Sequence, residues 1–287
     1  TILAVIGAAP VLLAGCVSGT KPVEAPAYQE TPVTIDAADH YIPGVLTMPA
    51  GKGPFPVVVM LHGYGSNKDE AGGGYKLFAP QLAGNGIASV RIDFLGCGES
   101  TADHAGFDLN VGVAEALKAA AWLAARPEID AERVGVMGWS KGGAIALLAA
   151  GSDARFKSVL TWAGAPDLSG VYTAEGFAAA RRNGVYTATF DWRGPLAMSL
   201  HAFEVAAAAN VLTEFSVSPA PVLAINGGAD TVVPPATAER IRAASQNAAS
   251  RALIIPGADH TFNIFSGDLS VFNALCEETA AWFRETL

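Results

Sequence analysis

The sequence has few cysteines and little charge. Only three of its 287 residues are cysteine and 16% are charged, whereas 51% are hydrophobic. Three cysteines provide no disulfide framework, and a chain of this length and apolar content can bury a large core without one. The length suits a single α/β domain with insertions.

Positive charge is scarce. The chain has 18 lysines and arginines against 27 acidic residues, for a net charge of −9. This balance argues against nucleic-acid binding and against an electrostatic hold on anionic lipid. No basic patch and no cysteine–histidine cluster with metal-ligand spacing occurs. We therefore expect no nucleic-acid partner, no metal and no cofactor.

The apolar stretch at the start of the sequence is too short to span a bilayer. Residues 2–13 suit the apolar region of a signal peptide instead, and they run into LAGC at 13–16. Small residues directly before a cysteine resemble the bacterial lipobox, in which that cysteine is acylated. The sequence predicts a signal segment at 1–16, lipidation at Cys16 and a lipid-anchored protein of the bacterial cell envelope. The alternatives are a plain secretory signal, giving a secreted or periplasmic protein, and a buried apolar strand.

A proline-containing stretch follows the cysteine. Residues 17–32 hold Pro22, Pro26 and Pro32 among polar residues and show no apolar periodicity. We predict a flexible tether over 17–32, a folded domain over 33–287 and membrane contact only through the lipid.

A strand, a glycine-flanked serine and a helix follow one another along the chain. The apolar run 133–137 precedes GWSKG at 138–142, and the helix-like run 144–150 follows. The serine sits on a strained turn, and side chains two residues to either side would collide with strand and helix. The N-terminus of the helix points its positive end at the serine. The pattern predicts Ser140 as the nucleophile of a G-x-S-x-G hydrolase.

A serine nucleophile needs a base, and the base needs an orienting acid. Asp230 and then His260 come just past the ends of two strand-like runs, where open α/β sheets build their sites. We predict Ser140, Asp230 and His260 as the catalytic triad. Asp259 adjoins His260, but sequence neighbours rarely aim at one another, so Asp230 is preferred.

A candidate oxyanion loop follows another strand. The apolar run 57–61 is followed by HGYG at 62–65, which resembles the oxyanion loop of esterases and lipases. The backbone N–H groups of Tyr64 and Lys141 are the predicted donors to the oxyanion. We expect His62 to be a structural loop histidine and not a second base.

Apolar strand-like runs alternate with helix-like stretches along the chain. Near-continuous apolar strands separated by helices predict a mostly parallel sheet that is covered on both faces. The strand-like runs are 57–61, 88–92, 133–137, 158–162, 222–226 and 252–255, and the helix-like ones include 111–125, 142–150, 236–247 and 269–284.

The segment from about 165 to 218 interrupts this alternation. It is long, it follows the sixth strand, and it precedes Asp230. We predict a small cap that covers the active site and supplies an apolar pocket. Its aromatic residues either line that pocket or form the cap's own core, namely Tyr172, Phe177, Tyr186, Phe190, Trp192 and Phe203.

Together these motifs resemble the α/β-hydrolase superfamily from about residue 42 to the C-terminus. Residues 42–49 are similar to its opening strands, 62–70 to its oxyanion segment and 91–100 to its D-x-x-G-x-G-x-S turn. The cinnamoyl (feruloyl) esterase-like and dienelactone-hydrolase-like serine esterases are the most similar members, and 181–196 resembles their short cap.

Two departures from those relatives limit what the resemblance implies. Dienelactone hydrolases proper have a cysteine where this chain has Ser140, so that activity is disfavoured. Many esterases have a histidine before the nucleophile, where this chain has Trp139. The resemblance implies a serine carboxylester hydrolase that acts through an acyl-enzyme on small to medium esters, short-chain or hydroxycinnamoyl.

Two alternatives remain open. One is an amidase or peptidase of the prolyl-oligopeptidase-like branch, because the triad is shared. The other is a non-catalytic, surface-tethered binding protein that retains the fold.

Overall fold

The computed structural model describes residues 28–287 of the chain. Those residues form one large sheet, a separate hairpin and eight α-helices. The strands are β1 (Tyr28–Asp36), β2 (Tyr41–Pro49), β3 (Phe55–Leu61), β4 (Ala88–Ile92), β5 (Ile129–Trp139), β6 (Phe156–Trp162), β7 (Val185–Ala188), β8 (Leu196–Ser199), β9 (Val222–Gly227) and β10 (Arg251–Ile255). The α-helices are α1 (Gly74–Gly84), α2 (Leu109–Ala124), α3 (Lys141–Ser152), α4 (Ala174–Asn183), α5 (Leu200–Ala208), α6 (Val211–Phe215), α7 (Thr237–Ala244) and α8 (Ser270–Thr286).

The large sheet has the order β1-β2-β4-β3-β5-β6-β9-β10. From β4 to β10 all neighbouring strands pair in parallel, and β2 runs against β1 and β4. The carboxyl ends of the parallel strands therefore meet at one edge. Strands β3 and β5 lie in the middle, where continuous apolar sequence is buried on both faces.

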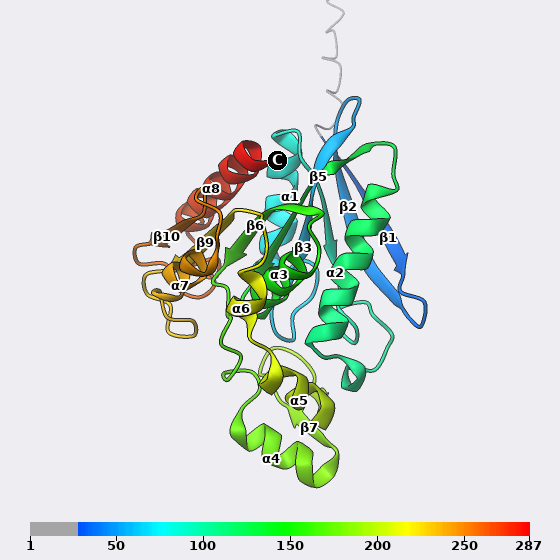
Figure 1. Ribbon diagram of the computed structural model, residues 1–287, viewed down its shortest axis with the longest axis vertical. Coiled ribbons are helices and arrows are strands. Elements are labelled where there is room, and N and C mark those ends of the chain that lie inside the picture. The colour runs from blue at the N-terminus through cyan, green and yellow to red at the C-terminus, as the bar shows by residue number, and fades with distance from the viewer. Residues whose placement is uncertain (1–27) are drawn as a thin grey trace, which may run out of the picture.

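Helices cover both faces of the sheet. On one face α2, α3 and α7 contribute to a core that includes Ile145 and Ile241. On the other face α1 and α8 pack through Phe78, Phe272 and Trp282. Figure 1 shows these helices around the central strands. The predicted architecture, a mostly parallel sheet with helices on both faces, is confirmed.

Several helices begin at a side chain that satisfies a free backbone N–H. The Asp108 carboxylate accepts from Val111 N before α2 (2.9 Å), and the Thr173 hydroxyl accepts from Gly176 N before α4 (3.1 Å). Such caps fix where a helix starts. The helix α3 differs, because its N-cap residue is Ser140 and the hydroxyl of Ser140 makes no capping hydrogen bond.

The predicted tether was too long at its C-terminal end. Residues 28–32 belong to β1 and pair with residues 45–49 of β2, so the folded domain does not begin at residue 33. The exposed, polar side chains of β1 hid this strand in the sequence. Pro32 is compatible with it because β1 is an edge strand. The predicted signal segment, Cys16 and the rest of the tether lie outside the described residues.

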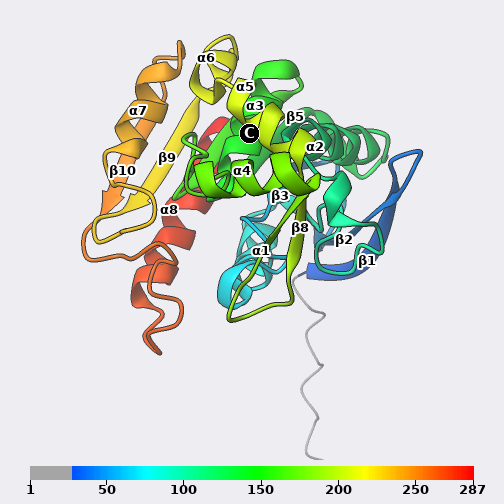
Figure 2. The ribbon, with the colours of Figure 1, turned by 90° about the horizontal axis from the view of Figure 1, so that it is seen from below.

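The insertion after β6 contains α4, the hairpin of β7 and β8, α5 and α6. In Figure 1 the labels α4, α5 and β7 lie together at one end of the molecule, and Figure 2 views it from that end. Phe203 is the centre of a small separate core. The last helix, α6, packs instead against the main domain through Val211 and Phe215. The cap predicted after the sixth strand is thus present as a projecting unit.

Candidate active site

Ser140 occupies the sharp turn between β5 and α3. Its backbone has φ 53° and ψ −120°, a region that side chains rarely adopt. Three backbone hydrogen bonds hold the turn in place: Ser140 N donates to Trp162 O (2.9 Å), and Gly143 N and Ala165 N donate to Ser140 O (2.9 and 3.0 Å). Strain of this kind persists only where the surroundings enforce it, and it exposes the hydroxyl at the sheet edge.

The glycines that flank the serine are required by close backbone contact. A Cβ atom on Gly138 would overlap the Gly142 carbonyl, and one on Gly142 would overlap the Leu61 carbonyl. Gly63 approaches the serine from the other side, because a Cβ atom there would lie 3.4 Å from Ser140 Cβ. The spacing G-x-S-x-G is therefore dictated by the packing of β3, β5 and α3.

Asp230 and His260 come together from the ends of β9 and β10. His260 Nδ1 and Asp230 Oδ2 are 2.8 Å apart, and Asp230 is only 5% exposed. The other carboxylate oxygen accepts from Val232 N and Val233 N, both at 2.8 Å. With Nδ1–H donating to the carboxylate, Nε2 is left to accept a proton. The structure thus brings the two predicted residues, Asp230 and His260, into hydrogen-bond contact.

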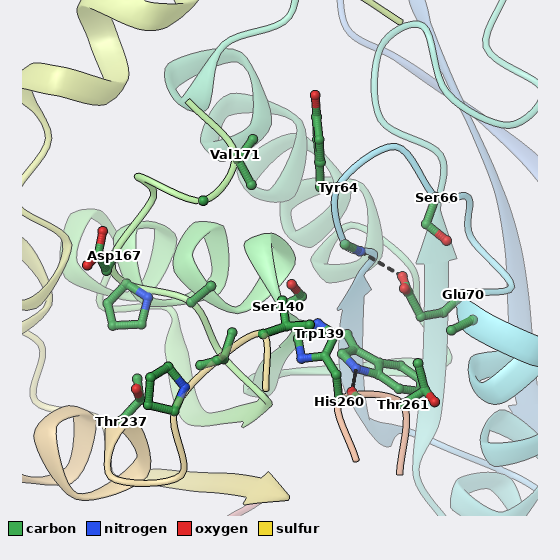
Figure 3. A pocket seen from close by; sticks show the side chains of 18 of the residues that line it. Tyr64, Ser66, Glu70, Trp139, Ser140, Asp167, Val171, Thr237, His260 and Thr261 are labelled. Atoms are coloured by element: carbon green, nitrogen blue, oxygen red, sulfur yellow. Dashed lines mark hydrogen bonds between the residues drawn. The ribbon is translucent and has the colours of Figure 1, made fainter. Parts of the chain in front are cut away.

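Ser140 and His260 line the same cavity, where Figure 3 shows both. Within residues 28–287 no hydrogen bond joins their side chains. Such bonds are often long in the absence of substrate and tighten only in the complex.

The neighbouring Asp259 has a different task. Its carboxylate accepts from the N–H groups of Thr261 and Asn263, at 2.8 and 2.9 Å, and so shapes the loop that carries His260. It forms no hydrogen bond with the imidazole in the described part of the chain. The preference for Asp230 over Asp259 agrees with this geometry.

Trp139 also holds the loop that carries His260. Its indole Nε1–H donates to His260 O over 3.1 Å, and Figure 3 draws this bond. The ring is fully buried and packs edge-on against Trp162 with centroids 5.2 Å apart. A buried indole requires an acceptor, but sequence alone does not reveal one that is 121 residues away. This contact was missed by the sequence interpretation.

The two backbone N–H groups that the sequence predicted as oxyanion donors have no hydrogen-bond acceptor in the described part of the chain. Within residues 28–287 the backbone N–H groups of Tyr64 and Lys141 donate to no other group. Both lie beside Ser140, one in the loop after β3 and the other as the first residue of α3. The N-terminus of α3 adds its positive dipole at this point.

The Lys141 side chain is buried away from the cavity. Its Nζ lies 4.2 Å from the centre of the Phe107 ring and 5.3 Å from that of Tyr64. Burial lowers the pKa of this amine to about 8. The amine therefore packs behind the oxyanion loop and braces the Tyr64 ring by a cation–π contact.

His62 is structural, as expected. Its Nε2 accepts from Phe94 N (3.1 Å), which leaves Nδ1–H to donate to Gly63 O (2.9 Å). Burial lowers the pKa of this imidazole to about 3, so it is neutral near neutral pH. A neutral, doubly hydrogen-bonded ring has no free nitrogen with which to act as a base.

Glu70 is a second residue that the sequence did not single out. Its Oε2 accepts from Gly63 N over 2.7 Å, as Figure 3 shows. Burial raises the pKa of the carboxyl to about 8. Its backbone has φ 60°, in the region that favours glycine. Perturbed titration and strain at a cavity wall are typical of functional sites.

The cavity has a volume of about 840 Å³ and is lined by residues from the main domain and the cap. Of the cap aromatics, Phe190 and Trp192 line it. Tyr172, Phe177 and Tyr186 pack around Phe203 instead. Both interpretations of the aromatic segment thus hold, each for a different subset.

Within residues 28–287 no three histidine, cysteine or acidic side chains gather as a metal site. No helix of that part of the chain is long and apolar enough to cross a membrane. Cys97 and Cys276 are both buried and unpaired with each other.

This fold and this site define an α/β hydrolase. The family model of the prolyl oligopeptidase family matches residues 79–287, well over half of the chain. The chain belongs to that family.

Individual relatives support the same fold. Esterase EstD of Thermotoga maritima is 38% identical over 73 residues, which are 24% of this chain and 17% of that protein. The chain therefore spans less than a fifth of the length of this relative.

Two solved structures are similar over nearly their whole length. Est1E of Butyrivibrio proteoclasticus with bound ferulic acid has a TM-score of 0.72 at 18% identity, covering 88% of this chain and 98% of that one. Dienelactone hydrolase of Anabaena variabilis has a TM-score of 0.64 at 24% identity, covering 91% and 99%.

Proposed function

We propose that this protein is a serine carboxylester hydrolase that works through an acyl-enzyme. One observation carries the proposal: a histidine held by a buried aspartate lines the same cavity as a serine on a strained strand-to-helix turn. Serine, acid and base come from three different strand ends, in the chain order of this fold.

In the proposed reaction His260 first accepts a proton and later returns it, while the other groups orient and stabilise. Ser140 Oγ attacks the ester carbonyl carbon while His260 Nε2 takes its proton. Asp230 keeps the imidazole in the required tautomer and stabilises its charged form. The N–H groups of Tyr64 and Lys141 stabilise the oxyanion, and His260 returns the proton to the departing alcohol. Water activated by His260 then releases the acyl group.

The cavity favours substrates larger than acetyl esters. Its volume of about 840 Å³ is in the range that takes a drug-sized ligand. Three apolar side chains that line it are largely exposed: Trp192 at 62%, Val232 at 65% and Phe265 at 69%. We propose medium-sized esters with an apolar or aromatic part, such as hydroxycinnamoyl esters. The ferulic acid bound by the structural relative Est1E supports this choice.

Hydrolysis of p-nitrophenyl acetate and butyrate tests the nucleophile. We expect Ser140→Ala to lower kcat by roughly 10⁴-fold or more. The matched control is Ser169→Ala, a serine of the same cavity outside the triad. A Ser140→Ala enzyme that keeps a tenth of wild-type activity would refute the proposal.

The second candidate is an amidase or peptidase. The match to the prolyl oligopeptidase family favours it, because the triad serves either bond. Matched ester and anilide substrates with one acyl group distinguish the two. Faster turnover of the anilide, relative to the uncatalysed reactions, would replace the esterase proposal.

We also propose that a lipid on Cys16 anchors the enzyme to the bacterial cell envelope. The support is the LAGC pattern at 13–16. Globomycin should block maturation, and Cys16→Ser should release the protein from the membrane fraction. Unchanged membrane partitioning of that variant would contradict the anchor.

A further inference from the structure

The oxyanion loop is held at both ends by side chains outside the triad. On the side of the main domain, Glu70 Oε2 accepts from Gly63 N over 2.7 Å. On the side of the cap, Arg193 Nη1 donates to Gly65 O over 2.5 Å. The two bonds flank Tyr64, whose own N–H is one of the proposed oxyanion donors. They therefore restrain the peptide groups 62–63 and 65–66, which bracket the short segment that carries the Tyr64 N–H.

The Tyr64 side chain is held by the cap as well. Its hydroxyl donates to Met198 Sδ of β8 over 2.9 Å, and its ring meets Phe190 edge-on with centroids 5.3 Å apart. Gly65, at φ 65°, leaves room for this contact, because a Cβ atom there would lie 3.3 Å from Phe190 and 3.4 Å from Arg193. The hairpin of the cap thus packs directly on the oxyanion loop.

Arg193 contacts main-chain carbonyls and, among residues 28–287, does not act as a partner in a surface ion pair. It lies in the connection between β7 and β8 and is half-buried. It also contacts the Gly194 carbonyl, the Cys97 sulfur at 3.9 Å and the face of the Phe190 ring, whose centre lies 5.9 Å from the guanidinium carbon. In the described part of the chain no carboxylate pairs with it. Its guanidinium instead donates to main-chain carbonyls, one of them in the loop that aims Tyr64 N–H.

We propose that Glu70 and Arg193 are positioning residues of the oxyanion hole, Glu70 from the main domain and Arg193 from the cap. Because the hole works only if its donors are aimed before the charge develops, loosening the loop lowers the rate without weakening substrate binding. The cap then contributes to turnover even of esters too small to touch it. This inference rests on the proposed esterase function.

The test is a split between kcat and KM with p-nitrophenyl acetate. Complete loss of an oxyanion donor typically costs 10²–10³-fold, so a misaimed donor should cost less. We expect Arg193→Ala and Glu70→Ala to lower kcat roughly 10-fold, with KM changed less than about 2-fold. Arg193→Lys, which keeps a donor and the charge, should recover part of the loss. The control is Arg182→Ala, an exposed arginine of α4 in the same cap.

A transition-state analogue supplies the readout that a merely structural role would not move. A phenylboronic acid forms a tetrahedral adduct with the serine and places an oxygen in the oxyanion hole. Its inhibition constant should rise in the variants by the same factor by which kcat/KM falls. Thermal unfolding of each variant separates this effect from loss of the fold, and Arg193→Lys takes the place of Arg193→Ala if the latter does not fold.

The outcomes separate this inference from the proposed function. Wild-type turnover that is lost in Ser140→Ala, but unchanged in folded Arg193→Ala, would overturn the positioning role alone. A rise in KM at constant kcat would also overturn it, since it would show a binding contact. Wild-type protein that hydrolyses no ester would contradict the proposed function itself.

Discussion

The main domain and the cap arrange their parts of the active site by different physical means. In the main domain, main-chain packing sets the geometry of the nucleophile turn: the backbone leaves no room for a side chain at positions 138 and 142, and Ser140 is forced to φ 53°. In the cap, side-chain contacts do so, as where Phe190 meets Tyr64 at 5.3 Å. The difference implies that changes in the main domain alter reactivity towards every substrate, whereas most changes in the cap alter selectivity.

Arg193 is the expected exception to this division. It belongs to the cap, yet its hydrogen bond reaches the oxyanion loop of the main domain.

The largest effect is expected at the triad acid. Asp230→Asn should lower kcat by about 10⁴-fold for all esters, because an amide favours the wrong imidazole tautomer. The measurement is kcat for acetate and for a hydroxycinnamate ester. Asp259→Asn is the matched control, since Asp259 bonds only to its own loop. A greater loss in Asp259→Asn than in Asp230→Asn would reverse the assignment.

The next largest effect is expected on stability, when a glycine of the main domain and a glycine of the cap are each replaced by alanine. A Cβ atom on Gly142 would overlap main-chain carbonyls, whereas one on Gly170 of the cap would meet nothing within 4 Å. We expect Gly142→Ala to lower the free energy of unfolding by about 3 kcal/mol and Gly170→Ala to leave it nearly unchanged. Urea unfolding measures both. Equal stability of the two variants would contradict the steric account of the turn.

Glu70 should make stability depend on pH. Burial raises the pKa of its carboxyl from 4.5 to about 8, so between these values the folded state keeps a proton that the unfolded chain has lost. The contribution of Glu70 to stability therefore falls as the pH rises through this range. Glu70→Gln should remove this trend, and its advantage over wild type should grow by about 1–2 kcal/mol from pH 5 to pH 8. The free energy of unfolding of both proteins is measured in urea at pH 5 and at pH 8. An equal difference between Glu70→Gln and wild type at the two pH values would show that the carboxyl is already ionised in the folded protein.

The smallest effect is expected at the exposed edge of the cap. Trp192 is 62% exposed and lines the cavity. Trp192→Ala should raise KM for a hydroxycinnamate ester about 5-fold, because roughly 1 kcal/mol of apolar contact is lost. The kinetics of p-nitrophenyl acetate should be unchanged. An equal effect on both esters would place Trp192 with Arg193 as a positioning residue.

The same division explains what the sequence revealed. Strand ends and steric glycines are local features, so the sequence was enough to propose Ser140, Asp230 and His260 as candidates, and the structure places the last two 2.8 Å apart. The six predicted strands of the main domain are all present. Their continuous apolar sequence reflects burial on both faces, which is independent of distant partners.

Features that depend on distant partners were missed. The bond from Trp139 to His260 O spans 121 residues, and that from Arg193 to Gly65 O spans 128. Residues 28–32, the first part of the polar edge strand β1, were assigned to the tether because their pairing with β2 is visible only in three dimensions. Helix α1 was missed as well, since glycines precede it and Pro80 lies inside it.

A fluorophosphonate reacts with an activated serine and therefore tests whether Ser140 is the nucleophile. The reagent is applied to folded protein and the adduct is located by peptide mass spectrometry. We expect a single adduct on Ser140, lost in Ser140→Ala and formed far more slowly in His260→Ala. No adduct on folded wild-type protein would favour a binding protein that retains the fold, and an adduct on another residue would contradict the assignment of Ser140.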